Sequence, residues 1–250
     1  MLNRNFIVFS EFLQKLDFKK ESDQRFLCLQ VSLIVFYLPT SQNSNVHAKA
    51  LQKEVIELRK KGFQVFVVRE KVWINKEELI KKMIQSKLQK RIAVFARDLS
   101  VHQINEQIAN NFLKKNHLLG ASRGRWYLAL SIPPHRSFRF QHYSAGDMLG
   151  IAVFGKNIKR KKEGFEGMQS IEWVRFSTIP EIRIVGGLGK VFEKLFQMEK
   201  YDDIMTYVDI ETNDSLGLQA FGFEVEEMTA PILIEEEFNL GNYKLRYVRS

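Results

Sequence analysis

The sequence contains little cysteine, proline or glycine. Cys28 is its only cysteine, so the chain forms no internal disulfide, which is typical of proteins in a reducing compartment. Five prolines and fourteen glycines among 250 residues exclude long flexible linkers and collagen-like repeats. The longest apolar stretch, residues 26–38, is shorter than a membrane span and contains Gln30 and Ser32. Acidic residues occur throughout the first 25 positions, unlike in a secretory or organellar leader. These absences predict a soluble cytoplasmic protein with no membrane partner.

The remaining composition is that of an ordinary globular protein. Hydrophobic residues make up 45% of the chain and charged residues 27%. The length suffices for one large domain or two modest ones with a sizeable core. The five histidines and Cys28 do not have the spacing of metal ligands, so we expect no metal site.

Charge is distributed unevenly along the chain. Residues 1–90 contain 17 Lys+Arg and 9 Asp+Glu, and residues 91–200 contain 18 and 9. Residues 201–250 reverse the balance, with 3 Lys+Arg and 11 Asp+Glu. A basic surface attracts polyanions such as nucleic acid, acidic proteins or a phosphate-rich cofactor, although many of these lysines also suit solvated helix faces. Charge alone identifies no partner.

Residues 1–89 predict a small basic βαβ domain. A buried strand is expected over residues 26–38, a helix from about residue 50 to Lys60, and a second strand over residues 63–68. Gly62 ends the helix after a basic last turn. Strand, helix, glycine and strand in this order are typical of a parallel βαβ unit. Asn75 is expected to cap a further helix that continues to Leu88.

Residues 90–250 predict a second α/β domain with more strands. The expected strands are 92–96, 126–132, 148–154, 171–177, 204–209 and 231–234, and the expected helices are 102–115, 190–198 and 215–220.

A glycine-rich turn joins one of these strands to a helix. Val185, Gly186, Gly187, Leu188 and Gly189 precede the helix that we expect to begin at Lys190. Glycines let backbone N–H groups converge on an anion, and the dipole of the following helix favours negative charge. Lys190 adds a cation there. A tight turn without a ligand explains the same glycines, and the spacing is neither that of a Walker loop nor that of a dinucleotide fingerprint.

The order of these motifs resembles the GNAT N-acetyltransferase family over about residues 91–235. The resemblance to its central strand and acyl-CoA pyrophosphate loop is carried by Glu172-Trp173-Val174-Arg175-Phe176, Pro180, Arg183, Gly186-Gly187-Leu188-Gly189, Val191, Phe192 and Leu195. Val208, Asn213 and Phe221-Gly222-Phe223 resemble the elements that follow. Gly187 and Gly189 match the family pattern Gln/Arg-x-x-Gly-x-Gly/Ala, whereas Ile184 occupies its first position. The resemblance implies a GNAT-like mixed sheet flanked by helices, with the small βαβ domain before it.

The resemblance also implies an N-acyltransferase that uses acetyl-CoA or another acyl-CoA and an amine acceptor. Glu172 takes the place of the family's general base. Cofactor contacts are implied for Val174, Val185, Gly186, Gly187, Leu188, Gly189, Lys190 and Asn213. Leu218 stands where the family has its tyrosine general acid and cannot donate a proton, so Tyr207 or Ser215 is the candidate replacement.

A narrower resemblance is to the GNAT-like domain of phage and bacterial homing-endonuclease-associated proteins. It is carried by Phe95-Ala96-Arg97, Asn116-His117-Leu118, Gly120, Phe154-Gly155-Lys156, Val185-Gly186-Gly187, Tyr207, Asp209 and Gly222-Phe223. Glu70 and Trp73 resemble the segment joined to that domain, and residues 1–89 then resemble a remnant of a nuclease fold. The single pair Glu70-Lys71 is too little to hold Mg²⁺ for phosphodiester cleavage.

The alternative hypothesis is a nucleic-acid-binding (DNA-binding) protein with a catalytically degenerate GNAT-like domain. His117, Arg123, Arg125 and Asp209 are candidates for contacts with substrate or nucleic acid. Lys159-Arg160-Lys161-Lys162, Arg136 and Arg139 add to the basic surface, and Phe138, Phe140 and Tyr143 are candidates for base stacking.

Overall fold

The computed structural model describes residues 4–42, 44–160 and 165–249. The chain divides into two compact units. The first combines Met1–Lys81 with Tyr207–Leu245, and the second combines Lys82–Thr206 with Arg246–Ser250. This division differs from the expected domains 1–89 and 90–250, because the acidic C-terminal segment belongs to the first unit. Lys161 and Lys162 lie outside the described residues.

The first unit contains a four-stranded sheet with the order β1-β2-β3-β4. Its elements before the second unit are α1 (Arg4–Gln14), β1 (Lys19–Lys20), β2 (Arg25–Cys28), β3 (Leu33–Leu38), α2 (Asn45–Lys60), β4 (Gln64–Arg69) and the start of α3 (Glu70–Leu88). β3 pairs in parallel with β4, so β3, α2 and β4 form the expected βαβ unit. The ring of Phe9 on α1 packs against those of Phe26, Tyr37 and Trp73, which form an aromatic core.

The expected strand over residues 26–38 was wrong, because it is two strands. Ser32 has φ +50°, and a 3-10 turn at Leu29–Val31 reverses the chain so that β2 pairs antiparallel with β3. Both strands are buried, so the apolar run continues through the turn. Four helix starts also differ. The helix expected from about residue 50 begins at Asn45, and α3 begins at Glu70 instead of Asn75, with a kink at Lys76. The helix expected from residue 102 begins at Glu106, and the one expected from Lys190 begins at Gly187. His102, the expected helix start, lies in a strand and pairs with Ala129.

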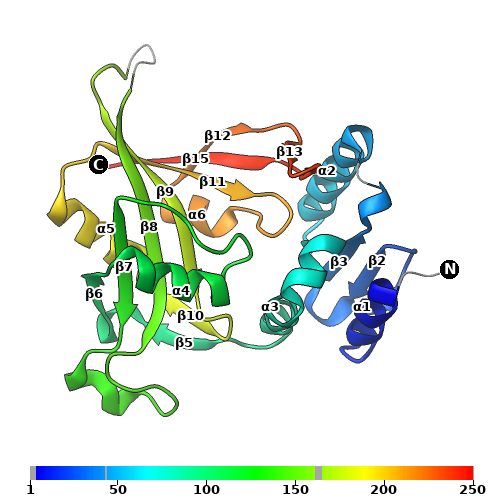
Figure 1. Ribbon diagram of the computed structural model, residues 1–250, viewed down its shortest axis with the longest axis horizontal. Coiled ribbons are helices and arrows are strands. Elements are labelled where there is room, and N and C mark those ends of the chain that lie inside the picture. The colour runs from blue at the N-terminus through cyan, green and yellow to red at the C-terminus, as the bar shows by residue number, and fades with distance from the viewer. Residues whose placement is uncertain (1–3, 43, 161–164, 250) are drawn as a thin grey trace. The chain divides into compact units, whose positions relative to one another are not determined.

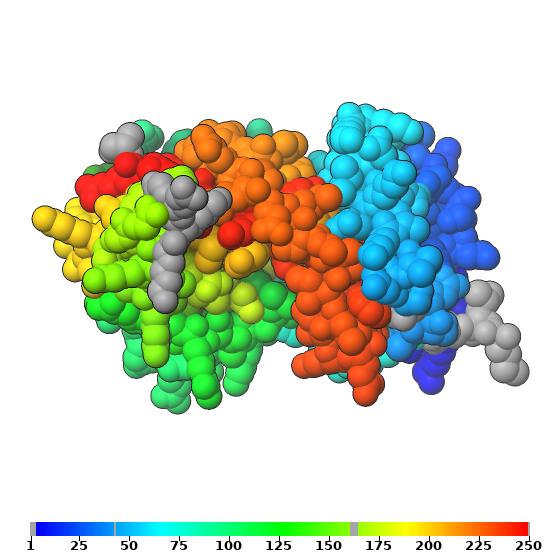
Figure 2. Space-filling view, turned by 90° about the horizontal axis from the view of Figure 1, so that it is seen from above, coloured from blue at the N-terminus to red at the C-terminus, as the bar shows by residue number. Residues whose placement is uncertain are grey.

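The C-terminal part of the first unit packs on α2. It includes the end of β11 (Asp203–Asp209), α6 (Leu216–Phe221), β12 (Glu224–Met228), β13 (Leu233–Ile234), β14 (Glu237–Phe238) and the start of β15 (Asn242–Val248). Figures 1 and 2 show the segment around β13 beside α2, although about 180 residues separate them. The Gln52 amide on α2 donates to the carbonyls of Thr229 and Leu240, and Leu51 and Val55 share a core with Leu240.

The second unit is built on antiparallel strands. Its elements are β5 (Ile92–Phe95), β6 (Ser100–Gln103), α4 (Glu106–Asn116), β7 (Trp126–Ser131), β8 (Met148–Lys159), β9 (Gln169–Thr178), β10 (Ile182–Val185), α5 (Gly187–Met198) and the start of β11. Within this unit the strands of the larger sheet have the order β11-β9-β8-β7-β6, and β10 with β5 forms a separate parallel pair. This confirms a mixed sheet flanked by helices.

Helices cover both faces of β7. On α4, Ala109, Phe112 and Leu113 pack against Tyr127, Ala129, Ile151 and Val153, and Figure 1 shows α4 lying across these strands. The first turn of α5 lies near Leu130. Because side chains alternate along a strand, Leu130 points to the opposite face of the sheet from Tyr127 and Ala129. Phe192 of α5 stacks edge-on against Trp173 of β9 at 5.5 Å between ring centroids. The two helices therefore fix β9 inside the core.

One buried charge ties four segments of the second unit together. The Asp203 carboxylate at the start of β11 is fully buried and accepts hydrogen bonds from Arg160, Arg246 and the Ser170 hydroxyl. Both arginine side chains are less than a tenth exposed.

We expect Asp203→Asn to lower the free energy of unfolding by about 3–5 kcal/mol, because it leaves two buried guanidinium groups without a full counter-charge. Urea denaturation followed by circular dichroism measures the change. Glu193→Gln, at an exposed position of α5, is the control and should shift stability by less than about 0.5 kcal/mol. Equal stabilities of the two variants would contradict this account.

Candidate functional site

Strand β9 has one edge that is paired only in its first half. On one side it pairs with β8 from Gln169 to Thr178. On the other side it pairs in parallel with β11 over four residue pairs, ending at Trp173 and Thr206. The backbone of residues 174–178 is therefore open on that side, as far as the described residues extend. An open strand edge offers alternating N–H and C=O groups to an extended ligand.

A β-bulge lies where this open edge begins. Val153 of β8 faces Arg175, and Phe154 faces Trp173, so Val174 is the extra residue. Such bulges re-aim a strand locally and occur often beside active sites. Val174, which was predicted to contact a cofactor, is therefore the residue at which the strand changes direction.

Glu172 lies next to a second irregularity in the same pair of strands. Gly155 and Lys156 of β8 occupy the space opposite Glu172, because Phe154 pairs with Trp173 and Asn157 with Ile171. A Cβ on Gly155 would lie 3.4 Å from Val174 and 3.6 Å from Glu172, which are ordinary van der Waals contacts. The Glu172 side chain is partly buried.

Arg175 is a site residue to which sequence analysis gave no role. Its Nη1 donates to the Val174 carbonyl at 2.8 Å, while the Trp173 indole donates to the Arg175 carbonyl at 3.0 Å. Burial lowers the pKa of Arg175, and the negative charge of Glu172 partly offsets this. The buried Nε has no hydrogen-bond partner among the residues that the structure describes. In the sequence, Arg175 is a charged residue inside a predicted strand and belongs to the run 172–176 that carries the family resemblance.

The glycine-rich turn forms the N-terminus of α5, as predicted. Gly186 adopts the left-handed conformation with φ +77°, and the helix runs from Gly187. The Lys190 amide donates to the Gly186 carbonyl at 3.2 Å. The amides of Gly187, Leu188 and Gly189 precede this bond and have no helical carbonyl to meet. They are hydrogen-bond donors at the positive end of the helix dipole, which suits an anion.

Two residues of this turn serve packing. A Cβ at Gly187 would be 2.7 Å from Cγ2 of Ile184, so only glycine fits between the helix and β10. The Lys190 ammonium donates to the carbonyls of Ala96, at 2.9 Å, and Leu99. It fastens α5 to the 3-10 turn after β5 and is not directed at the anion that the helix amides would bind. Val185 is 38% exposed at the end of β10.

Tyr207, Asp209 and Asn213 belong to the first unit. Tyr207 is 45% exposed and follows Thr206, whose hydroxyl donates to the Trp173 carbonyl. Asn213 accepts a hydrogen bond from the Ser215 amide, which makes it part of a turn. Ser215 is buried and accepts from the Gln219 side chain.

Asp209 stands beside a buried ion pair of the first unit. Arg69 binds Glu211 with two nitrogens, and Glu211 also accepts from the Leu240 amide. Asp209 accepts from the Glu211 amide and the Thr212 hydroxyl. Burial, and then the charge of Glu211, raise the pKa of Asp209 to about 7. This cluster holds the two ends of the first unit together.

Three of the four candidates for substrate or nucleic-acid contacts lie in the second unit, whereas Asp209 lies in the first. His117 caps α4, and its Nδ1 accepts from the Leu119 amide. Arg123 is exposed. Arg125 pairs with Glu199 at 3.0 Å, stacks over Trp126 and adjoins the Tyr201 hydroxyl, which donates to Glu199. Arg125 is therefore engaged within the unit.

Within the described residues, no group of three or more His, Cys, Asp or Glu side chains is placed to hold a metal ion. Glu70, of the Glu70-Lys71 pair, accepts from the Thr40 amide at 3.1 Å. Over the same part of the chain, no helix has both the length and the apolarity to cross a bilayer.

No protein-family model matches the chain, and a search of curated proteins finds no match. Among solved structures, Arabidopsis thaliana Naa50 with a bisubstrate analogue is 14% identical, with TM-score 0.41, covering 61% of this chain and 99% of its own. Arabidopsis thaliana NAA60 with acetyl-CoA is 11% identical, with TM-score 0.42, covering 60% and 99%. The Escherichia coli ribosomal-protein-S18-alanine N-acetyltransferase is 12% identical, with TM-score 0.41, covering 61% and 94%.

The raised pKa of Asp209 makes the stability of the protein depend on pH. Because this pKa is about 7 in the folded chain, against 3.8 for an unperturbed aspartate, the folded state holds the proton more tightly. The free energy of unfolding should therefore fall as pH rises from about 4 to about 7, and Asp209→Asn should flatten this slope. Urea titrations at several pH values test it, with Glu193→Gln as the control. An unchanged slope in Asp209→Asn would contradict it.

Proposed function

We propose that this protein is an acyl-CoA-dependent N-acyltransferase, which transfers an acetyl or other acyl group to an amine. The observation that carries the proposal is the bulged strand β9, open along one edge after Trp173 and followed by a helix with unpaired N-terminal amides. The resemblance to the GNAT family lies in the same residues. Arrangement and motif thus point to the same ligand chemistry.

The residues present suit an acyl-CoA. Its pyrophosphate would accept hydrogen bonds from the amides of Gly187, Leu188 and Gly189, and its amide-bearing arm would pair with the open backbone of residues 174–178. Arg175 would offer its unpartnered Nε in the same region. When bound, the cofactor supplies an activated thioester. The Lys190 ammonium bonds to main-chain carbonyls, so it would hold the turn in place instead of contacting the pyrophosphate.

Glu172 is the proposed general base. A carboxylate beside the strand that binds the cofactor arm is suited to take a proton from the attacking amine. Glu172 lies between two irregularities in the pairing of β8 with β9. Leu218 has no proton to donate, so the leaving thiolate would be protonated by Tyr207, whose phenol is exposed, or by water. Ser215 is less suited because it is buried and bonded to Gln219.

A specific observation also bears on the nucleic-acid alternative. Arg97 stacks over Phe95 and Arg139 over Phe138, which resembles surfaces that stack bases. Against it, Arg125 and Arg160 are held in ion pairs. The relationship to homing-endonuclease-associated proteins and a cytoplasmic location stay predictions.

The anion site is tested by substitution at Leu188, which keeps its amide. Leu188→Glu places a negative charge in the first turn of α5, which favours the helix but repels a pyrophosphate. We expect acetyl-CoA binding, measured by calorimetry in moderate salt, to weaken at least tenfold, or about 1.4 kcal/mol. Leu188→Gln, of nearly equal size, should bind nearly as the wild type does. If the wild type does not bind acetyl-CoA, the proposed cofactor is wrong.

The general base is tested with Glu172→Gln. We expect the rate of CoA release with a panel of peptide and polyamine acceptors to fall about 10²–10⁴-fold, while acetyl-CoA affinity is retained. A variant with full activity would refute the assignment of Glu172.

A further inference from the structure

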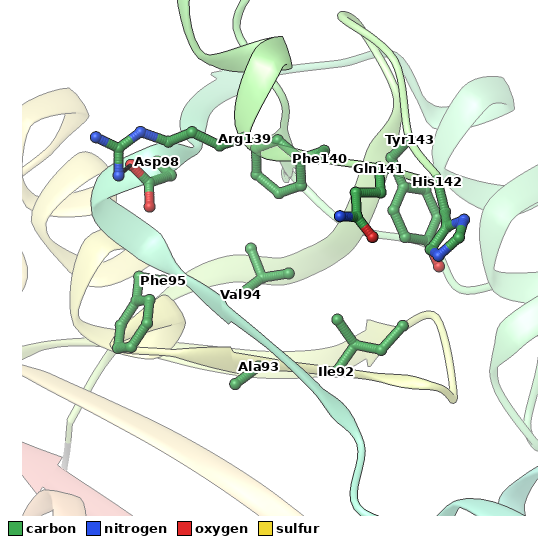
Figure 3. Close-up of a pocket in the computed structure, with 10 residues that line it drawn as sticks. All are labelled: Ile92, Ala93, Val94, Phe95, Asp98, Arg139, Phe140, Gln141, His142 and Tyr143. Carbon is green, nitrogen blue, oxygen red and sulfur yellow. Dashed lines mark ion pairs between the residues drawn. The ribbon is translucent and has the colours of Figure 1, made fainter.

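A pocket of about 460 Å³ lies in the second unit, between β5 and the loop that joins β7 to β8. Figure 3 shows Ile92 and Val94 on β5 directed toward the loop, where Phe140 and Tyr143 face them. Asp98 and Arg139 form an ion pair at one end, with 3.4 Å between Oδ1 and Nη1. The proposed acyl-CoA site does not account for this pocket, whose residues Arg139, Phe140 and Tyr143 were named above as candidates for nucleic-acid contacts.

Strand β5 has an unpaired edge. Its one strand neighbour, within the described part of the chain, is β10, with which it forms a two-stranded parallel sheet. The Ile92 amide donates to the carbonyl of Glu181, the residue just before β10. Residues 92 and 94 therefore direct their backbone N–H and C=O groups toward β10. Those of Ala93 and Phe95 then point to the opposite edge. Both residues line the pocket although Figure 3 shows their side chains directed away from the loop, so main chain contributes to the lining.

Arginines flank β5 in the sequence and occur on its neighbour β10 and in the loop between β7 and β8. Arg91 and Arg183 adjoin each other, and burial together with this repulsion lowers the pKa of Arg91. Arg97 lies over the Phe95 ring. None of these three forms an ion pair within the described residues. Arg136 and Arg139 share the single carboxylate of Asp98. Of these five arginines only Arg139 lines the pocket itself. Asp98 lines it too, and Glu181 and Asp147 act on the lining residue Tyr143, so arginines outnumber acidic groups in this region by five to three.

We propose that the open edge of β5 binds an extended acidic peptide segment of a partner protein. The segment adds as a strand, bonding to the main chain of Ala93 and Phe95. Its apolar side chains enter the pocket over Ile92 and Val94, and its carboxylates meet the surrounding arginines. Backbone pairing supplies affinity, while the pocket and the charges supply specificity. This inference does not depend on acyl-CoA binding.

The test uses a fluorescein-labelled, end-capped peptide of alternating valine and glutamate, without acyl-CoA. We expect saturable binding by fluorescence anisotropy, slower hydrogen exchange of residues 92–95 in the complex, and at least tenfold weaker binding of the matched valine–lysine peptide. Loss of binding should also follow from Arg97→Glu. An absence of binding, or equal binding of the lysine peptide, would overturn the proposal.

Substitutions at Ala93 separate backbone pairing from general charge attraction. Ala93→Pro removes the N–H at the open edge, where proline is tolerated, and should weaken binding about tenfold or more. Ala93→Val keeps the N–H and should bind as the wild type does. Undiminished binding by Ala93→Pro would overturn strand addition, and if this variant unfolds, hydrogen exchange in the wild type still decides. Tighter binding of a (dT) oligonucleotide of equal charge would assign the surface to nucleic acid instead. Concentration-dependent self-association that the peptide does not inhibit would assign the surface to a second copy of the chain.

Discussion

The Asp203 carboxylate is the interaction on which the second unit depends. It binds two arginines and a serine hydroxyl, and these come from the end of β8, from β9 and from β15. β11 begins at this carboxylate and pairs with β9 for only four residues. The open edge of β9 therefore starts a fixed distance from a buried, strongly bonded anchor. A charge at this position costs desolvation, and its full complement of partners offsets that cost while specifying register.

The anion site at α5 is defined by close packing as much as by hydrogen bonding. Gly187 contacts Ile184 so tightly that no side chain fits, and Lys190 fastens the same turn to the segment after β5. Rigid donors lose little entropy on binding, since they are already oriented. Phe192 and Trp173 extend this rigidity to β9, so the helix and the bulged strand move as one body.

The sequence predicted the elements whose patterns are local. The βαβ unit, the strand at β9, the glycine turn and the helix α5 follow from apolar periodicity and glycine placement. The division of residues 26–38 was missed because Ser32, in a left-handed turn, leaves no mark on a buried apolar run. The four-residue strand β10 was not predicted, although β5, which has the same length, was. Lys190 and Arg125 bond to residues that are distant in the chain, which the sequence does not reveal. Both were therefore predicted to contact a ligand, whereas in the structure they bond within the protein.

The first unit is discontinuous in sequence, and this has a consequence for the chain during synthesis. Arg69 becomes buried only against Glu211, which lies 142 residues later. At a translation rate of about 5–20 residues per second, roughly 7–28 s pass before this partner is made. During that interval the sheet β1-β2-β3-β4 lacks the C-terminal segment that packs on α2. A ribosome-bound chain must therefore keep the apolar face of α2 soluble until the segment emerges, which makes the nascent first unit a natural client for chaperones.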